Sequence, residues 1–153
     1  MEPPEITDEH RWLQKHIGIW EFEMVTESEN GDRFTGTEVV TAMGENWIHV
    51  RGSSNMGESL VQLGFDPTKE EFIGTWAGTM MHMIWQYRGQ LDSTGNLLTL
   101  ESEGPSFTNP EETCLYHDCL HWIDDKHREF YSEYQKADGS WERFMLLNLT
   151  RVG

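Results

Sequence analysis

Closely spaced turn signals divide the sequence into about ten short segments in which apolar and polar residues alternate. Asn30-Gly31, Asp66-Pro67 and Asp138-Gly139 are strong turn formers, because Asn-Gly and Asp-Gly tolerate the positive φ of a tight hairpin and Pro favours a type I turn. Nearly every link is short enough for a hairpin, which favours an up-and-down meander over a Greek key. The sequence therefore predicts an all-β fold, an antiparallel up-and-down barrel of about ten strands.

A short helix is expected before the first strand. Thr7 can cap the free backbone N–H groups of its first turn, and Gly18 ends it. Asp8 and Glu9 suit the positive end of the helix dipole. Because no linker, repeat or low-complexity tract interrupts the chain, residues 1–153 are expected to form one domain, with this helix as a plug at one barrel mouth.

Acidic residues outnumber basic residues, 27 to 11, and give a formal net charge of −16. Such a field repels nucleic acid and anionic membranes, so neither is expected as a partner. Residues 1–5 are acidic and lack the apolar core of a secretory signal, and no apolar run is long enough to span a bilayer. A cytoplasmic location is therefore expected, while the sequence leaves homo-oligomer formation open.

Gly18-Ile19-Trp20, at the start of the first expected strand, resembles the Gly-x-Trp signature of the lipocalin and calycin barrels. In those barrels the Trp closes the base and a basic residue of the last strand packs over its ring. The resemblance therefore implies that Arg151 lies over Trp20.

A longer set of blocks covers nearly the whole chain. They are residues 10–20, Gly64-Phe65-Asp66-Pro67, Gly74-Thr75-Trp76-x-Gly78, Met80-Met81, and residues 85–89, 97–100 and 102–106. In order and spacing they resemble a bacterial family catalogued as domain of unknown function 1579 (DUF1579). This family carries no agreed activity, so the resemblance implies a calycin-type barrel and little more.

The expected interior is aromatic. Trp85 and Tyr87 share one strand face with Met83 and Leu91, and this more apolar face should point inward. Trp76 of the neighbouring strand would join them. Small barrels are often filled by their own side chains, whereas about ten strands leave room for one small ligand. The sequence leaves open whether this interior is a cavity or a filled core.

His117, Cys119 and His121 share one face of a later strand. Imidazole and thiolate are zinc and copper ligands, but positions i, i+2 and i+4 spread over about 13 Å, too far to hold one ion together. Cys114 lies on the opposite face from Cys119, so a disulfide between them is not expected. The segment Met80-Met81-His82-Met83 offers soft ligands, yet methionines more often fill a pocket mouth.

The expected function is reversible binding of a small apolar or amphipathic molecule in the barrel cavity. The expected ligand-binding residues are four that supply contact area, Trp76, Met81, Trp85 and Tyr87, and three that orient polar groups, Glu103, His117 and His121. Glu103 stands at the expected barrel rim, where it could instead hold the loop that follows. No metal and no cofactor is predicted, although haem or a transition metal stays open.

Two other classes of function stay open. The related nitrobindin barrels bind haem through a His near the chain end, but residues 141–152 contain none, so haem would need His117, His121 or His127. No Gly-x-Ser-x-Gly, phosphate loop or activated cysteine is present, so no catalytic residue is predicted for an enzyme, whether haem-dependent or a lipocalin-like isomerase or hydrolase. The third class is a filled barrel that acts as an interaction protein through its outer face.

Overall fold

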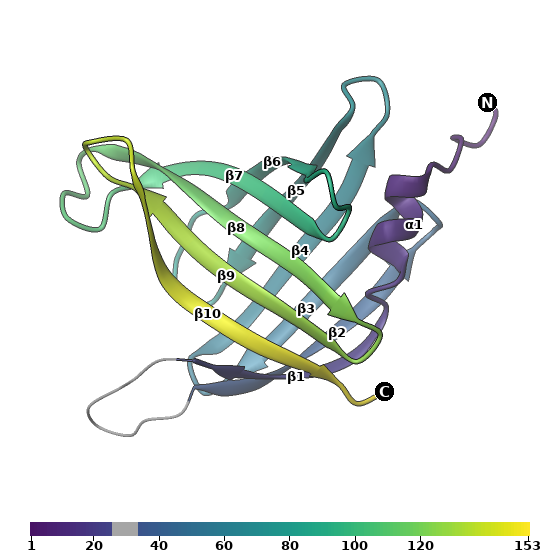
Figure 1. Ribbon diagram of the computed structural model, residues 1–153, viewed down its shortest axis with the longest axis horizontal. Coiled ribbons are helices and arrows are strands. Elements are labelled where there is room, and N and C mark those ends of the chain that lie inside the picture. The colour runs from purple at the N-terminus through teal and green to yellow at the C-terminus, as the bar shows by residue number, and fades with distance from the viewer. Residues whose placement is uncertain (26–33) are drawn as a thin grey trace.

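The computed structural model describes residues 1–25 and 34–153, so the turn expected at Asn30-Gly31 lies outside the described residues. A short helix comes first and ten described strands follow it (Figure 1). In chain order the elements are α1 (Asp8–Gln14), β1 (Gly18–Met24), β2 (Thr35–Met43), β3 (Trp47–Ser54), β4 (Gly57–Asp66), β5 (Glu71–Gly78), β6 (Trp85–Leu91), β7 (Leu97–Pro105), β8 (Thr113–Asp124), β9 (His127–Gln135) and β10 (Trp141–Arg151).

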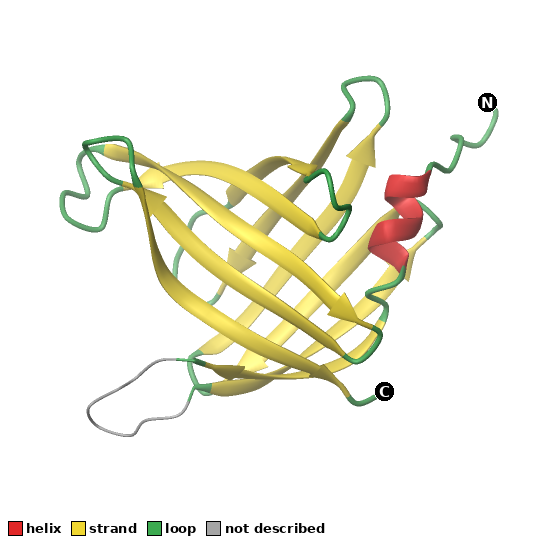
Figure 2. Cartoon of the chain, viewed as in Figure 1, coloured by secondary structure: helices red, strands yellow, loops and turns green. Residues whose placement is uncertain are grey.

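The described strands form one closed antiparallel barrel (Figure 2). Each strand pairs with its neighbours in sequence, and β1 closes the ring by pairing with both β2 and β10. At this closure Trp20 lies opposite Glu38 on β2 and opposite Arg151 on β10. The predicted all-β, up-and-down barrel with a short N-terminal helix is confirmed, because hairpin-length links bring sequential strands together as neighbours.

Strand alternation gives the barrel an apolar interior. On β1, Trp20 and Phe22 are buried whereas Glu21 and Glu23 are exposed. The same period of two on β7 buries Leu100 with its even-numbered neighbours and leaves the intervening side chains outside. The core is therefore one cluster enclosed by the ring of strands.

Trp20 closes the base of the barrel and is completely buried. The guanidinium carbon of Arg151 lies 4.4 Å from the centre of its ring, so the expected packing of Arg151 over Trp20 is confirmed. A second guanidinium, of Arg128 on β9, lies 4.7 Å from the same ring. Arg151 also donates to the carbonyl oxygens of Lys15 (2.7 Å) and Ile17 (2.6 Å). These bonds fasten the last strand to the segment that links α1 and β1.

The helix α1 is fastened to the barrel by three long-range hydrogen bonds, one of them from Nε2 of Gln14 to the carbonyl of Glu45. Its N-cap is the expected Thr7, whose hydroxyl accepts from the backbone N–H of His10. The ring of His10 bonds through Nε2 to the carbonyl of Phe65 (3.0 Å), and Trp12 donates through Nε1 to the carbonyl of Gly95 (2.7 Å). No helix in the described part of the chain is long and apolar enough to cross a membrane.

Met83 was expected on the same strand as Trp85, but β6 begins only at Trp85. β7 continues to Pro105. The extension of β7 follows from its partner, because residues 102–105 pair with β8. β6 and β7 thus reach nearly the same level at this end, although their ladder joins only residues 88–91 to residues 98–101.

Candidate ligand-binding cavity

A cavity of about 160 Å³ lies inside the barrel. Most of its walls are apolar side chains that alternation points inward, among them Phe22, Val61, Leu100, Phe130 and Leu147. These five residues come from five different strands. The interior is therefore a packed core that leaves one small apolar space.

Arg128 of β9 and Glu38 of β2 bring a polar pair to the wall of this cavity. Arg128 is only 3% exposed, and its Nη2 donates to Oε2 of Glu38. The pair neutralises two charges that would each be costly to bury alone. The Nε–H of Arg128 has no hydrogen-bond acceptor among residues 1–25 and 34–153. This donor is itself fully buried, so it stays unpaired beneath the surface that lines the cavity.

A second polar group links three strands inside the barrel. Tyr87 of β6 donates its hydroxyl hydrogen to Oδ2 of Asp118 on β8, and Ser132 of β9 donates to Oδ1 (2.6 Å). Burial raises the pKa of Asp118, against the lowering effects of the bonds from Ser132 and Tyr87. Burial, together with the charge of Asp118, also raises the pKa of Tyr87 well above its usual value. Tyr87 is therefore a neutral phenol, and its hydroxyl hydrogen is donated to Asp118.

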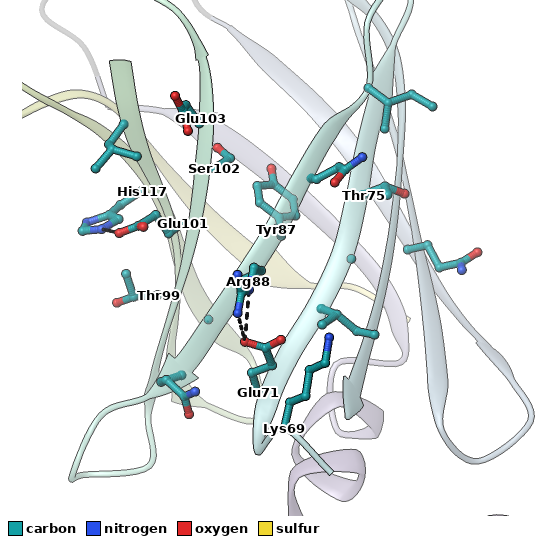
Figure 3. Close-up of a pocket in the computed structure, with 18 of the residues that line it drawn as sticks. Lys69, Glu71, Thr75, Tyr87, Arg88, Thr99, Glu101, Ser102, Glu103 and His117 are labelled. Carbon is teal, nitrogen blue, oxygen red and sulfur yellow. Dashed lines mark hydrogen bonds and ion pairs between the residues drawn. The ribbon is translucent and has the colours of Figure 1, made fainter. Parts of the chain in front are cut away.

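A larger cleft, of about 1170 Å³, lies on the outer side of the barrel where β6 and β7 separate (Figure 3). The ladder between these strands joins only residues 88–91 of β6 to β7, and within the described chain residues 85–87 have no ladder partner there. Arg88 and Glu71 form an ion pair in the cleft (3.1 Å). Tyr87 lines both the cleft and the cavity, so it stands at the boundary between them.

Trp85 crosses the seam between β6 and β7 on the inner side. Its ring packs directly on Gly104 of β7, where an added Cβ would lie 2.1 Å from the ring. The ring also meets Tyr116 of β8 edge to face, with centroids 5.2 Å apart. Only a glycine at position 104 lets the indole approach the strand this closely.

Of the four apolar contact residues predicted from sequence, Trp76 and Tyr87 line the cavity. Met81 lies in the exposed loop between β5 and β6, where its Sδ accepts from Nε1 of Trp85 (3.0 Å). Its neighbour Met80 lines the cavity instead. Met81 and Trp85 are thus joined to each other beside the cavity rather than in its wall.

The three polar residues predicted to orient a ligand lie on the outer face. Glu103 lines the outer cleft. His117 lies between Oε2 of Glu101 (3.2 Å) and Oε1 of Glu133 (3.0 Å), and His121 lies 3.2 Å from a glutamate of β9. The even-numbered positions of β8 face inward, so His117 and His121 point away from the cavity.

The described residues contain no group of three or more His, Cys, Asp and Glu side chains placed to hold a metal ion. None of the cavity-lining side chains described is a histidine. His127 is exposed, so, like the two outer-face histidines, it offers no axial ligand to a haem in the cavity. Cys114 and Cys119 are free thiols, and burial raises the pKa of Cys119 to about 11, which keeps it protonated at neutral pH.

His16 is buried at the base of the barrel, with its ring edge-on to Trp122 (4.9 Å). Neither ring nitrogen has a hydrogen-bond partner in the described chain. Burial, and then the positive charges of Arg128, Lys15 and Arg151, lower the pKa of His16 well below its usual value. His16 is therefore neutral and packs as an apolar ring.

Sequence analysis missed the polar residues that face the interior, namely Glu38, Asp118, Arg128 and Ser132. The signal that could have found them is their position in the two-residue alternation of each strand, on the same face as apolar residues. Arg128, for example, stands two positions before Phe130, and both line the cavity. A charged residue in phase with the apolar face of a strand is therefore the pattern that finds such sites.

Comparison with known proteins supports the barrel. A family model described as "Protein of unknown function (DUF1579)" matches residues 5–151. No curated protein matches the chain. Among solved structures, an S-type phycobiliprotein lyase, CPES, from Guillardia theta is 11% identical with a TM-score of 0.53, over 98% of this chain and 99% of that one. A redesigned β-barrel, mFAP1, bound to DFHBI is 14% identical with a TM-score of 0.39, over 93% and 99%. At 11% identity, the likeness to the lyase shows the fold alone.

Proposed function

The chain belongs to the DUF1579 family of proteins of unknown function, and we propose that it reversibly binds a small apolar or amphipathic molecule in its barrel cavity. The observation that carries this proposal is the cavity of about 160 Å³ with mainly apolar walls. Ligand sites in proteins are typically concave and largely apolar, with few polar groups that fix orientation. Here Trp76, Tyr87 and Met80 supply contact area, and the pair of Arg128 and Glu38 supplies polarity.

The size of the cavity limits the ligand. An apolar cavity of about 150 Å³ stays dry and takes up benzene. A volume of about 160 Å³ therefore suits one six-membered ring with a small substituent, or a short branched chain. Because the nearby side chains Met81 and Trp85 belong to the loop and seam beside the cavity, they would limit entry rather than hold the bound molecule.

Toluene tests the proposal, because it consists of one ring and one methyl group. Titration calorimetry of the whole chain should show saturable binding at one site. Val61→Phe fills the cavity and should weaken toluene binding at least about tenfold. Leu60→Phe is the matched control, since Leu60 is the next residue on β4 and lies exposed on the outer face. It should change binding by less than about twofold.

A filled barrel that works through its outer face gives the opposite result. In that case toluene and similar apolar probes fail to bind, and Val61→Phe matters only for folding. Binding that Leu60→Phe weakens as much as Val61→Phe would place the probe outside the barrel. Either outcome overturns the cavity as the working site.

A further inference from the structure

Glu38 presents a carboxylate oxygen to the cavity. The residue lines the cavity, and its side chain is 15% exposed, compared with 3% for its partner Arg128. The bond from Arg128 is made to Oε2. The other oxygen, Oε1, accepts no hydrogen bond from residues 1–25 and 34–153 and, unlike the Nε of Arg128, it is not fully buried. It is therefore an acceptor that a bound molecule can reach.

Small residues line the cavity beside this carboxylate. Gly52 on β3 is the ladder partner of Glu38, and Ser59 on β4 is the ladder partner of Gly52. Both line the cavity, and a Cβ added to Gly52 would lie 2.7 Å from the hydroxyl oxygen of Ser59. The absence of a side chain at position 52 leaves the approach to Glu38 open. The wall at this place can therefore receive the polar group of a ligand.

We propose that the ligand of this cavity carries a neutral hydroxyl group, as an alcohol or a phenol does, which donates its hydrogen to Oε1 of Glu38. Its apolar body lies among the apolar walls near Val61, Leu100 and Leu147. This ligand chemistry rests on the proposed function, because both concern the same cavity.

The ligand needs a donor because a molecule that fills the cavity keeps solvent away from Oε1. An ionised carboxylate only accepts hydrogen bonds, and a buried charge is costly unless its hydrogen bonds are made. A hydrocarbon or an ether would leave Oε1 unpaired, whereas a hydroxyl replaces the lost solvent. Tyr87 favours the same chemistry, since it donates its hydrogen to Asp118 and offers only its oxygen to the cavity.

The donor is neutral because the charge of Glu38 is already balanced. The guanidinium of Arg128 is bonded to the carboxylate, so the two side chains together carry no net charge. A ligand ammonium would lose its hydration in the cavity, and it would meet Arg128 as a like charge. A ligand carboxylate would meet Glu38 in the same way. A hydroxyl donates its hydrogen without these penalties.

Three one-ring molecules of nearly the same size test this chemistry on the unmodified protein. Benzyl alcohol carries a hydroxyl donor, its isomer anisole carries an ether oxygen that only accepts, and benzylamine carries an ammonium at pH 7. In titration calorimetry benzyl alcohol should bind about tenfold more tightly than anisole, since hydrogen bonds to a charged group are stronger than those between neutral groups. Benzylamine should bind more weakly than benzyl alcohol.

Glu38→Gln keeps the shape of the side chain and an oxygen for the bond to Arg128, and it places an NH2 group where Oε1 lies. It should reduce the advantage of benzyl alcohol over anisole to less than about threefold and change the affinity for toluene by less than about twofold. Glu21→Gln is the matched control, since it removes the same charge from an exposed position on the neighbouring strand β1. It should preserve the advantage of about tenfold.

The possible results separate the two proposals. Equal binding of benzyl alcohol and anisole to the unmodified protein overturns the hydroxyl donor but leaves the cavity as a binding site. Tighter binding of benzylamine than of benzyl alcohol overturns the argument for a neutral donor. An equal loss of the advantage in Glu21→Gln and Glu38→Gln overturns the contact with Glu38. Failure of all three molecules and of toluene to bind overturns both proposals. The comparison among ligands needs no variant, so it decides the matter even if Glu38→Gln fails to fold.

Discussion

Replacing either member of the Glu38–Arg128 pair should destabilise the barrel far more than replacing both. Glu38→Leu leaves a guanidinium that is 3% exposed and that stays charged at every pH at which the protein folds. Arg128→Met leaves a carboxylate whose side chain is 15% exposed. This carboxylate can still reach water, so the two single variants are not equivalent.

The magnitude follows from the burial of each charge. Removing one partner of a buried ion pair costs about 3–5 kcal/mol, and Glu38→Leu should lie at the upper end of that range. Arg128→Met should lie near the lower end, even though it also gives up the contact with Trp20, worth about 0.5–2 kcal/mol. For a chain of this length, 3–5 kcal/mol lowers Tm by about 6–20 °C. The double variant should fall within about 2 kcal/mol of the unmodified protein, giving a coupling energy of at least about 3 kcal/mol.

Urea unfolding at pH 7, followed by tryptophan fluorescence and far-ultraviolet circular dichroism, measures all four free energies of unfolding. If a single variant does not fold but the double variant does, the coupling energy still has the predicted sign. Additive effects, with a coupling energy below about 0.5 kcal/mol, would refute the reasoning that the pair is buried as a unit. A larger loss for Arg128→Met than for Glu38→Leu would refute the argument from exposure.

Three further substitutions test the seam, the base and the interior polar group. Gly104→Ala should cost about 1–3 kcal/mol in thermal unfolding, because the new Cβ would lie 2.1 Å from the Trp85 ring; a loss below about 0.5 kcal/mol would show that the ring moves freely. Between pH 6.5 and 5.5 His16 should remove about 1 kcal/mol of stability, since the unfolded chain takes up a proton near its usual pKa of 6.5 and the folded chain does not. His16→Phe should abolish that decline in urea unfolding, and an unchanged pH profile would contradict the neutral buried ring. The raised pKa of Asp118 gives a contribution that is complete below pH 3.8 and is lost as pH rises through the folded value. Asp118→Asn should therefore gain stability relative to the unmodified protein between about pH 4 and 7, and a constant difference across that range would count against this sign.

The closed barrel could be predicted because its signals are local. Alternation and turn residues act within a few positions, and hairpin-length links then fix which strands are neighbours. The contact of Arg151 with Trp20 followed from a resemblance, not from spacing, since the two residues are 131 positions apart. Alternation also placed His117 and His121 on one face, but it did not show that the opposite face of β8, with Asp118, is the one enclosed.

The candidate site was harder to predict because its contacts are long-range and depend on volume. Glu38 and Arg128 are 90 positions apart, and the phase of each residue in its own strand does not show which residue it will meet. Neither local sequence indicates that the charge of one residue will be neutralised by the other. Whether ten inward-facing rows fill their barrel is a sum over many side-chain volumes, which the sequence pattern does not specify. The cavity beside Tyr87 is the part of the interior that these side chains leave unfilled.

The partial ladder between β6 and β7 changes how this barrel holds its circumference. Elsewhere around the described ring, neighbouring strands are joined along most of their length by backbone hydrogen bonds, which are indifferent to the identity of the side chains. Across the unpaired part of this seam, the ring of Trp85 resting on Gly104 and the bond from Tyr87 to Asp118 take their place. A few side-chain contacts therefore set the distance between β6 and β7 in this part of the seam. Single substitutions can change that distance during evolution without changing the register of any strand.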